Sequence, residues 1–268
     1  MTPLNRLLSA LAGAPAVLVE VVATEGSVPR GAGTWMAVFA DRIVATIGGG
    51  RLEFDAVAEA RARLGGAAAS AGTRRYALGP SLGQCCGGVV HLRYTGIGAP
   101  DSAALRERLS GPGTPVALFG GGHVGAALAR VLVSLPFELT WIDSRDGIFP
   151  ADRPTDITCE HSDPVQAAVP GLAPGSRVLV MSFSHAEDLD VVAACLQRRR
   201  RHGDLPFIGL IGSRTKWATF RSRLRARGFT ETELDTVTCP IGVPGISGKE
   251  PEVIAVAVAA QLLQTLEA

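Results

Sequence analysis

The sequence predicts an α/β protein in which a smaller α/β domain, residues 1–112, precedes a Rossmann-like, doubly wound parallel sheet, residues 113–268. Strand-like and helix-like segments alternate throughout the second part, as a parallel sheet with crossover helices requires. The glycine pattern G-x-G-x-x-G joins the first of these strands to the first helix. The segment Gly111-Pro112-Gly113 breaks the chain, so the domain boundary is expected there.

The first part combines several strand signals with one clear helix. Continuous or alternating apolar and β-branched residues predict the strands. They cover residues 16–23, 34–39, 43–46, 73–78 and 89–94. Leu52, Val57 and Ala60 recur at helical spacing and predict a helix over residues 51–64. Asp101 can cap a further short helix before the boundary.

The second part predicts strands that alternate with helices. The strands cover residues 116–119, 138–142, 157–159, 178–181 and 206–211. The helices cover residues 124–135, 163–169, 187–196, 216–227 and 251–266. Thr230 and Glu233 form a capping box for one more helical turn. The final helix is apolar over most of its circumference, so we expect it to be buried against the first domain or a second subunit.

The glycine turn lies in the segment from Pro115 to Asp143. In such a unit Gly120 allows the tight turn, Gly122 lets the backbone approach a phosphate, and Gly125 lets helix and strand pack closely. Asp143 ends the following strand, where an acidic residue suits a ribose hydroxyl. The pattern predicts a Rossmann unit and leaves nucleotide binding open, because a fold does not determine its ligand.

Composition narrows the class of protein. A net charge of +1 with interspersed acidic and basic residues argues against nucleic-acid binding. No apolar run reaches the ~18 residues that cross a bilayer. The five cysteines are an odd number and do not form the framework of a secreted domain, so we expect a cytoplasmic protein. The basic run from Arg198 to Arg201 predicts a solvated helix end.

Three glycine-bracketed loops in the first domain predict a pocket for a phosphorylated ligand. They are Gly26 to Arg30, Gly48 to Gly50 followed by Glu53, and Gln84 to Gly88. Glycines expose backbone N–H groups, an arginine offers a planar fork to an oxyanion, and a helix N-terminus attracts an anion. Each loop alone is better explained as an ordinary turn, and Glu53 as a solvated first-turn acid; it is the three loops together that favour the pocket.

The adjacent thiols of Cys85 and Cys86 leave two interpretations open. Neighbouring cysteines do not suit one tetrahedral zinc, and no C-x-x-C or nearby histidine completes such a site. The thiols could instead bind a soft metal centre or carry sulfur as a persulfide. The alternative is two small apolar residues in a turn.

Polar residues also follow strands of the second domain, where ligands bind in open α/β sheets. His185, with Asp188 nearby, could donate a hydrogen bond or carry a proton. Arg214 and Lys216 could bind phosphate. The alternative is that Ser184 and Ser213 simply cap helices.

These motifs together resemble the XdhC/CoxI family of xanthine dehydrogenase accessory proteins. The residues that carry the resemblance are GSVPR with GAGTWM, IGGGRLE, QCCGG, FGGGHVG, SFSH, IGSR and SGKEPEVIAVAVAA, in that order over nearly the whole chain. Ser184 stands where the pattern of the family has threonine, and it keeps the hydroxyl.

The resemblance implies a protein that binds molybdenum cofactor (molybdopterin), holds it while a cysteine desulfurase supplies the terminal sulfur, and inserts it into apo-xanthine dehydrogenase or a related molybdenum hydroxylase. A homodimer is expected. The implied metal ligands or sulfur carriers are Cys85 and Cys86. The residues implied around the cofactor and a nucleotide-like subsite are Ser27, Arg30, Gly49, Gly50, Glu53, Gln84, Gly120, Gly122, Gly125 and Asp143.

Two other classes of function remain alternatives. One is an NAD(P)-dependent oxidoreductase of a small metabolite, with His185 as proton donor. The other is a scaffold that docks desulfurase to target enzyme and binds no small molecule. The favoured interpretation is a maturation chaperone rather than an enzyme.

Overall fold

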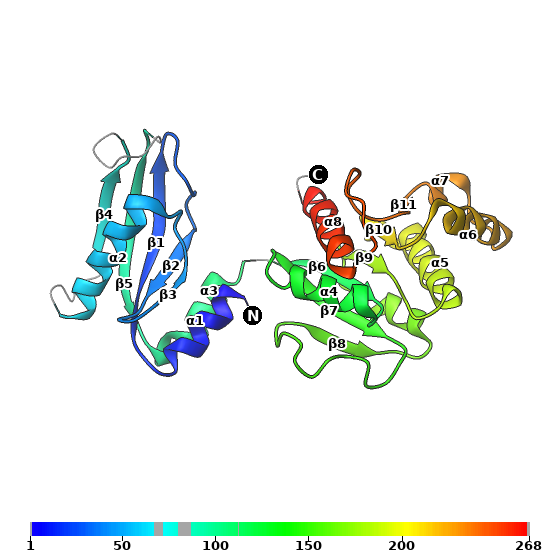
Figure 1. Ribbon diagram of the computed structural model, residues 1–268, viewed down its shortest axis with the longest axis horizontal. Helices are drawn as coiled ribbons and strands as arrows, with labels where there is room; N and C mark the ends of the chain where they lie inside the picture. Colours follow the sequence, from blue (N-terminus) through cyan, green and yellow to red (C-terminus); the bar gives the residue numbers. More distant parts are fainter. Residues whose placement is uncertain (1, 67–71, 80–86, 112, 267–268) are drawn as a thin grey trace. The chain divides into compact units, whose positions relative to one another are not determined.

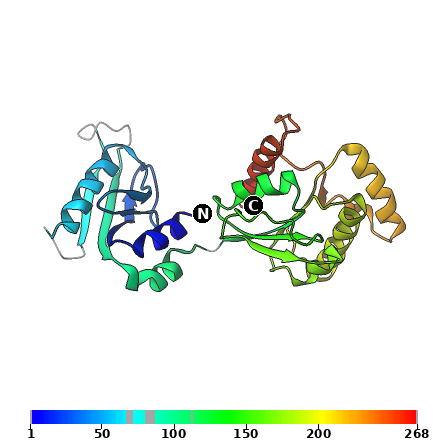
Figure 2. The same cartoon turned by 60° about the horizontal axis from the view of Figure 1, so that its bottom comes forward.

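The computed structural model describes residues 2–66, 72–79, 87–111 and 113–266. The chain divides into two compact units, Thr2–Ser110 and Gly111–Ala268, called here the N-terminal unit and the Rossmann unit. Figure 1 labels the elements of both and Figure 2 gives a second view. Each unit has its own sheet and its own buried core.

The N-terminal unit is built on an antiparallel sheet in the order β3-β2-β1-β5-β4. The strands are β1 (Ala16–Glu25), β2 (Trp35–Val38), β3 (Ile43–Ala45), β4 (Gly72–Ala77) and β5 (Val89–Ile97). The helical elements are α1 (Pro3–Leu11), α2 (Gly50–Leu64), η2 (Ala99–Asp101) and α3 (Ser102–Leu109). The predicted hairpin is present as β2 and β3, which pair antiparallel.

Strand β1 is buried on both faces because helices cover both. Val17 and Val19 pack in one core with residues of α2, whereas Leu18 packs in the other core with residues of α1 and α3. Helix α1 was not predicted. Its signals are a cap by Thr2, whose Oγ1 accepts from the backbone N–H of Asn5 at 3.2 Å, and a proline in the first turn.

The Rossmann unit contains a parallel sheet in the order β11-β10-β9-β6-β7-β8. The strands are β6 (Thr114–Phe119), β7 (Phe137–Asp143), β8 (Thr158–His161), β9 (Arg177–Val180), β10 (Phe207–Leu210) and β11 (Val237–Thr238). In chain order from β6 this is the 3-2-1-4-5-6 arrangement of a doubly wound dinucleotide-binding sheet. The predicted fold class, an α/β protein with a Rossmann-like parallel sheet, is confirmed.

Helices cover both faces of this sheet. They are α4 (His123–Leu132), η3 (Val165–Gly171), α5 (His185–His202), α6 (Arg214–Ala226), α7 (Glu231–Leu234) and α8 (Pro251–Gln264). Alternate residues of β6 point to the two layers: Leu118 packs with α4 and α8, and Phe119 packs with α5 and α6. The carboxyl ends of β6 and β9, where the strand order reverses, therefore lie between the two helical layers.

Two expectations for the Rossmann unit need correction, and one short strand was missed. The helix predicted over residues 163–169 is a 3-10 helix, η3, with Pro170 inside it. Strand β11 has only two residues and was not predicted. Helix α8 does bury its apolar side, but it packs on α4 within its own unit, with Ala255, Val258 and Leu262 in the shared core.

The basic run at the end of α5 is also more structured than a solvated helix end. Arg198 is largely buried and pairs with Asp204 at 2.6 Å, and it donates to the carbonyl of Val169 at 2.7 Å. Arg200 pairs with Glu233 at 2.6 Å. The run thus ties the end of α5 to neighbouring segments. The prediction was wrong for Arg198, whereas Arg200 is exposed as expected.

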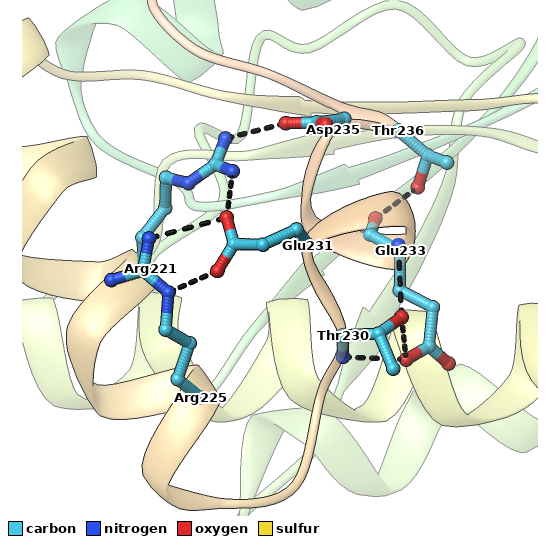
Figure 3. A network of polar contacts seen from close by, with 7 residues as sticks. All are labelled: Arg221, Arg225, Thr230, Glu231, Glu233, Asp235 and Thr236. Atoms are coloured by element: carbon cyan, nitrogen blue, oxygen red, sulfur yellow. Dashed lines mark hydrogen bonds and ion pairs between the residues drawn. The ribbon is translucent and has the colours of Figure 1, made fainter.

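Charged side chains connect α6 to α7 at the surface (Figure 3). The carboxylate of Glu231 lies between the guanidinium groups of Arg221 and Arg225, and Asp235 pairs with Arg221 at 2.7 Å. Thr230 and Glu233 form the predicted capping box. The network fixes the short helix α7 against the outer helix of the unit.

Candidate functional site

The glycine turn after β6 has the geometry of a dinucleotide-binding turn. Gly120 has a φ of 122°, and a Cβ built on it would lie 2.0 Å from the carbonyl oxygen of Met181. A Cβ on Gly125 would lie 2.0 Å from the carbonyl oxygen of Gly120. A Cβ on Gly122 would meet no described atom within 4 Å. The first and third glycines are therefore required by packing, and the second leaves the start of α4 open to a ligand.

Hydrogen bonds from β7 hold the glycine turn in place, and the N-terminus of α4 beside it has no capping side chain. The indole N–H of Trp141 donates to the carbonyl of Gly120 at 2.8 Å, and the N–H of Gly120 donates to the carbonyl of Ile142 at 2.8 Å. Gly122 is the N-cap of α4 and has no side chain with which to cap it. The partial positive charge of the helix N-terminus is thus directed at the space above the turn, which suits a phosphate.

Ser182 follows β9, the strand that pairs with β6. Its hydroxyl oxygen is buried, and within the described part of the chain it has no hydrogen-bond partner. Its backbone N–H donates to Asp188 at 2.7 Å. A buried hydroxyl without a partner is unfavourable, and this one lies just after β9, where the strand order reverses.

Asp143 lies at the end of β7 as predicted, but its carboxylate already has partners. Oδ2 accepts from the backbone N–H of Gly121 at 2.5 Å and from Nη2 of Arg145 at 2.9 Å. Oδ1 accepts from the backbone N–H and from Nε of Arg145, at 2.8 and 2.9 Å. Burial would raise the pKa of Asp143, but the hydrogen bonds from Arg145 and Gly121 outweigh it and hold the pKa below its usual value.

Arg145 was not predicted as a site residue, although its position two residues after Asp143 was a usable signal. Its guanidinium stacks over the ring of Phe183, 4.6 Å from the centroid. Phe183 is 66 % exposed, which is unusual for a large apolar residue. Nearby, Glu187 accepts from the hydroxyl of Ser144 at 2.7 Å and from the N–H of Phe183 at 3.1 Å.

In the N-terminal unit, the second glycine loop and the described end of the third each lie against the first. A Cβ on Gly48 would lie 2.8 Å from Cβ of Pro29 and 3.5 Å from Cγ of Arg30, which places the second loop against the first. A Cβ on Gly88 would lie 2.4 Å from the carbonyl oxygen of Ser27, which places the end of the third loop there too. Gln84, Cys85 and Cys86 lie outside the described residues, so their predicted roles remain predictions.

Glu53 corrects the expectation of a solvated acid beside an anion site. Its Oε2 accepts from the backbone N–H groups of Ile47 and Gly49, at 3.0 and 3.2 Å, and from the hydroxyl of Thr46. The carboxylate of the chain itself therefore occupies the amides that were expected to bind a ligand anion. Gly49 and Gly50 both have positive φ, which gives the loop its sharp turn into α2.

A cavity of about 440 Å³ lies beside this loop. Its lining residues are Ile43, Gly50, Glu53, Phe54, Val57, Ala58 and Arg61. Gly50 and Glu53 are predicted site residues, and Phe54 is 67 % exposed. The cavity thus combines a carboxylate, a cation and a flat apolar ring, which are groups that recognise a polar heterocycle.

The polar residues after β9 and β10 mostly serve local structure. Ser184 accepts from the N–H of Glu187 at 3.2 Å, and Ser213 accepts from the N–H of Lys216 at 3.1 Å, so both cap helices. Lys216 was expected to bind phosphate, but its Nζ lies 2.6 Å from Oδ2 of Asp188 and 2.8 Å from the carbonyl of Ile211. Both partners of this ion pair are nearly buried, so Lys216 is not available.

His185 and Arg214 are both exposed at the first position of their helices, α5 and α6. The ring of His185 makes an edge contact with Phe220, 6.2 Å between centroids. Within the described part of the chain, neither residue has a hydrogen bond or ion pair to the glycine turn. Their predicted roles in proton transfer and phosphate binding remain predictions.

Two features are absent from the described residues. No group of three or more histidine, cysteine, aspartate or glutamate side chains among them has an arrangement that could hold a metal ion. Likewise, none of the helices in the described ranges combines the length and apolar character needed to cross a membrane.

Comparisons with known proteins give a consistent result. The model of the XdhC Rossmann domain matches residues 116–262, and that of the XdhC and CoxI family matches residues 9–77. Among curated proteins, the uncharacterized protein YqeB of Escherichia coli (strain K12) is 26 % identical over 253 residues, which are 93 % of this chain and 43 % of that protein. The chain thus spans less than half the length of this relative.

A solved structure of a xanthine dehydrogenase from Bacillus halodurans has a similar fold, with a TM-score of 0.76 at 19 % identity. The similarity covers 100 % of this chain and 96 % of that one. The family models together match both units, and the Rossmann model alone matches more than half of the chain. The chain therefore belongs to the XdhC and CoxI family.

Proposed function

We propose that this protein is a maturation factor for xanthine dehydrogenase or a related molybdenum hydroxylase. It holds the molybdenum cofactor while a cysteine desulfurase supplies the terminal sulfur, and it then inserts the cofactor into the apo-enzyme. Membership of the XdhC and CoxI family suggests a role in xanthine dehydrogenase maturation. The observation that supports the cofactor part is the contact of Gly48 and of Gly88 with the first glycine loop, at Pro29 and Ser27 respectively.

The chemistry of these loops fits parts of the cofactor, whose bound molybdenum would supply the redox chemistry of the receiving enzyme. Backbone amides and Arg30 suit its phosphate, because arginine offers a planar fork of donors. The carboxylate of Glu53 and the exposed ring of Phe54 suit the polar, flat pterin. Cys85 and Cys86 follow Gln84 in the third loop, where a thiolate would serve as a soft ligand or as a sulfur carrier.

A protein that hands on its cargo needs moderate affinity. Micromolar binding, roughly −8 kcal/mol, allows both retention and release. The internal hydrogen bonds of Glu53 would weaken the binding of a ligand anion at the same amides, because the anion must first displace the carboxylate. The same proposal includes contacts with the apo-hydroxylase and the desulfurase, a homodimer, a cytoplasmic location, and no nucleic-acid or membrane partner.

The test is the molybdenum and pterin content of protein expressed where the cofactor is made and isolated anaerobically. We expect the wild type to carry both, and a Cys85→Ser, Cys86→Ser double variant to carry at least about tenfold less. Cys159→Ser, which changes a partly exposed cysteine of the Rossmann unit, is the control and should retain the cofactor. Wild-type protein without molybdenum would contradict the proposal.

A second candidate is an NAD(P)-dependent oxidoreductase of a small metabolite, with His185 as proton donor. The glycine turn at the reversal of a 3-2-1-4-5-6 sheet favours it. A change of NADH or NADPH fluorescence on titration, together with absence of molybdenum from the purified protein, would favour this candidate over the first. Molybdenum content and nucleotide binding are measured separately, so both outcomes are distinguishable.

A further inference from the structure

We infer that the glycine turn of the Rossmann unit takes a nucleotide with a phosphorylated ribose, NADP(H), in preference to NAD(H), and that Arg145 makes the selection. The inference rests on the nucleotide-binding part of the second candidate function and does not depend on the molybdenum cofactor. The sequence pattern alone predicts the opposite preference, for NAD(H), because an acid at the end of the second strand favours the ribose diol of NAD.

All acceptor directions of the Asp143 carboxylate are occupied, so none is left for a ribose hydroxyl. A carboxylate offers about four lone-pair directions. The N–H of Gly121 and Nη2 of Arg145 occupy two on Oδ2, and the backbone N–H and Nε of Arg145 occupy two on Oδ1. A diol could bind only by displacing Arg145 from a buried carboxylate, which would leave the guanidinium without its counter-ion.

Arg145 retains guanidinium N–H groups that can donate hydrogen bonds to an anion. Asp143 takes two of the five guanidinium N–H groups, and within the described ranges the other three have no hydrogen-bond partner. The side chain of Arg145 is 32 % exposed, so solvent and ligands reach it. Contact with the ring of Phe183 and the pair with Asp143 hold the guanidinium in place. A fixed planar fork of this kind suits a phosphate.

The guanidinium of Arg145 is linked to the glycine turn through the carboxylate of Asp143. Oδ2 of Asp143 bridges the N–H of Gly121 and Nη2 of Arg145, through contacts of 2.5 and 2.9 Å. The phosphate site at the start of α4 and the cation are thus neighbours on one edge of the sheet.

The negative charge of Glu187 repels a phosphate bound at Arg145, so a substitution of Glu187 provides a second test. Both of its oxygens accept hydrogen bonds, from Ser144 and Phe183, but its negative charge remains near Arg145. Replacing it with the neutral amide keeps a similar shape and removes the repulsion. The Glu187→Gln variant should therefore bind a phosphorylated ribose more tightly than the wild type does.

The test is calorimetric titration of the full chain with ADP, adenosine 2′,5′-bisphosphate and adenosine 3′,5′-bisphosphate, followed by NADH and NADPH. We expect the 2′,5′-bisphosphate to bind at least about tenfold more tightly than ADP, and NADPH more tightly than NADH by a similar factor. In Arg145→Gln the preference for the 2′,5′-bisphosphate should vanish, and the affinity for ADP should equal or exceed that of the wild type, because the substitution frees Asp143 for the ribose diol. Arg130→Gln, which changes an exposed arginine of α4, is the control.

Each other outcome counts against the inference in a distinct way. If ADP and both bisphosphates fail to bind, nucleotide binding at the turn is refuted together with the inference. If ADP binds as tightly as the 2′,5′-bisphosphate, the turn binds nucleotides but Arg145 does not select them. Equal binding of the two bisphosphates would refute the assignment to NADP(H) and indicate a site for any phosphorylated ribose. Thermal unfolding of each variant verifies that it is folded.

Discussion

Asp143 and Arg145 form a bidentate ion pair in which one partner is almost fully buried and the other is partly exposed. Because the carboxylate also accepts from Gly121, the pair fixes the glycine turn to the end of β7. Asp143→Asn removes the charge and one acceptor oxygen. We expect it to lower the free energy of unfolding by about 1–3 kcal/mol, measured by urea denaturation. A double-mutant cycle with Arg145→Gln should give a coupling energy above zero, and additive losses would contradict the pair.

The same residue predicts a pH dependence. The pKa of Asp143 is lowered in the folded state, so its contribution is complete above the usual carboxyl pKa of about 4 and is lost as pH falls through the folded value. The stability difference between wild type and Asp143→Asn should therefore be constant from pH 7 to about pH 5 and shrink below about pH 4. A difference that grows toward low pH would have the wrong sign.

The stability of the loop before α2 depends on the side chain of Glu53. It replaces the missing cap of a helix whose N-cap is Gly49 and satisfies the N–H groups of Ile47 and Gly49. Glu53→Ala should lower the free energy of unfolding by about 1–2 kcal/mol in chemical denaturation. Glu53→Gln retains one acceptor and should recover part of the loss. Equal stability of all three proteins would show that the loop does not need the side chain.

At the scale of elements, different glycines of the turn serve packing and ligand binding: Gly125 is closely packed, whereas Gly122 faces open space. Gly125→Ala inserts a methyl group against the carbonyl of Gly120 and should cost about 1–3 kcal/mol or more, because neither backbone segment can move freely. Gly122→Ala has open space and a φ of −72°, so its stability should stay within about 1 kcal/mol. It should nevertheless weaken ADP binding by about tenfold or more. Loss of stability without loss of binding in Gly122→Ala would contradict this division.

The connection of α6 to α7 (Figure 3) should depend on pH in a defined window. Hydrogen bonds from Arg225 and Arg221 lower the pKa of Glu231 to about 2. The contribution of Glu231 is therefore complete above its usual pKa of about 4.3 and is lost as pH falls from there toward 2. The melting temperature of Glu231→Gln should be below that of the wild type at pH 7, and the two should converge near pH 2. Identical melting temperatures at pH 7 would mean that the network contributes nothing.

At the scale of the whole molecule, periodic and local signals were sufficient for the fold of each unit. The alternation of β-branched and helical runs predicted most strands and helices, and the spacing of Gly120, Gly122 and Gly125 predicted the turn. Short or weakly patterned elements were missed: β11 has two residues, and α1 depends on a cap by Thr2. The position of α8 could not be predicted, because an apolar face does not specify which surface covers it.

The candidate sites were predictable as regions and not as arrangements of side chains. Residue types and spacing identified Asp143, Glu53 and Lys216 as polar groups near glycine loops or strand ends. Each of them forms bonds within the chain, with Arg145, with loop amides and with Asp188 respectively. Such pairings depend on three-dimensional distances between segments, which a single sequence does not contain. The positions of Gln84, Cys85 and Cys86 lie outside the described residues, so the thiol roles rest on chemistry alone.

Transfer of cofactor to its target tests the proposed function most directly. The protein is isolated with its molybdenum cofactor under anaerobic conditions and mixed with cofactor-free xanthine dehydrogenase, and the two are separated again. We predict that molybdenum leaves this protein, appears in the dehydrogenase, and restores its activity, whereas the Cys85→Ser, Cys86→Ser variant restores little. Molybdenum that stays with this protein, or a dehydrogenase that gains no more activity than with free cofactor, would contradict the role in maturation.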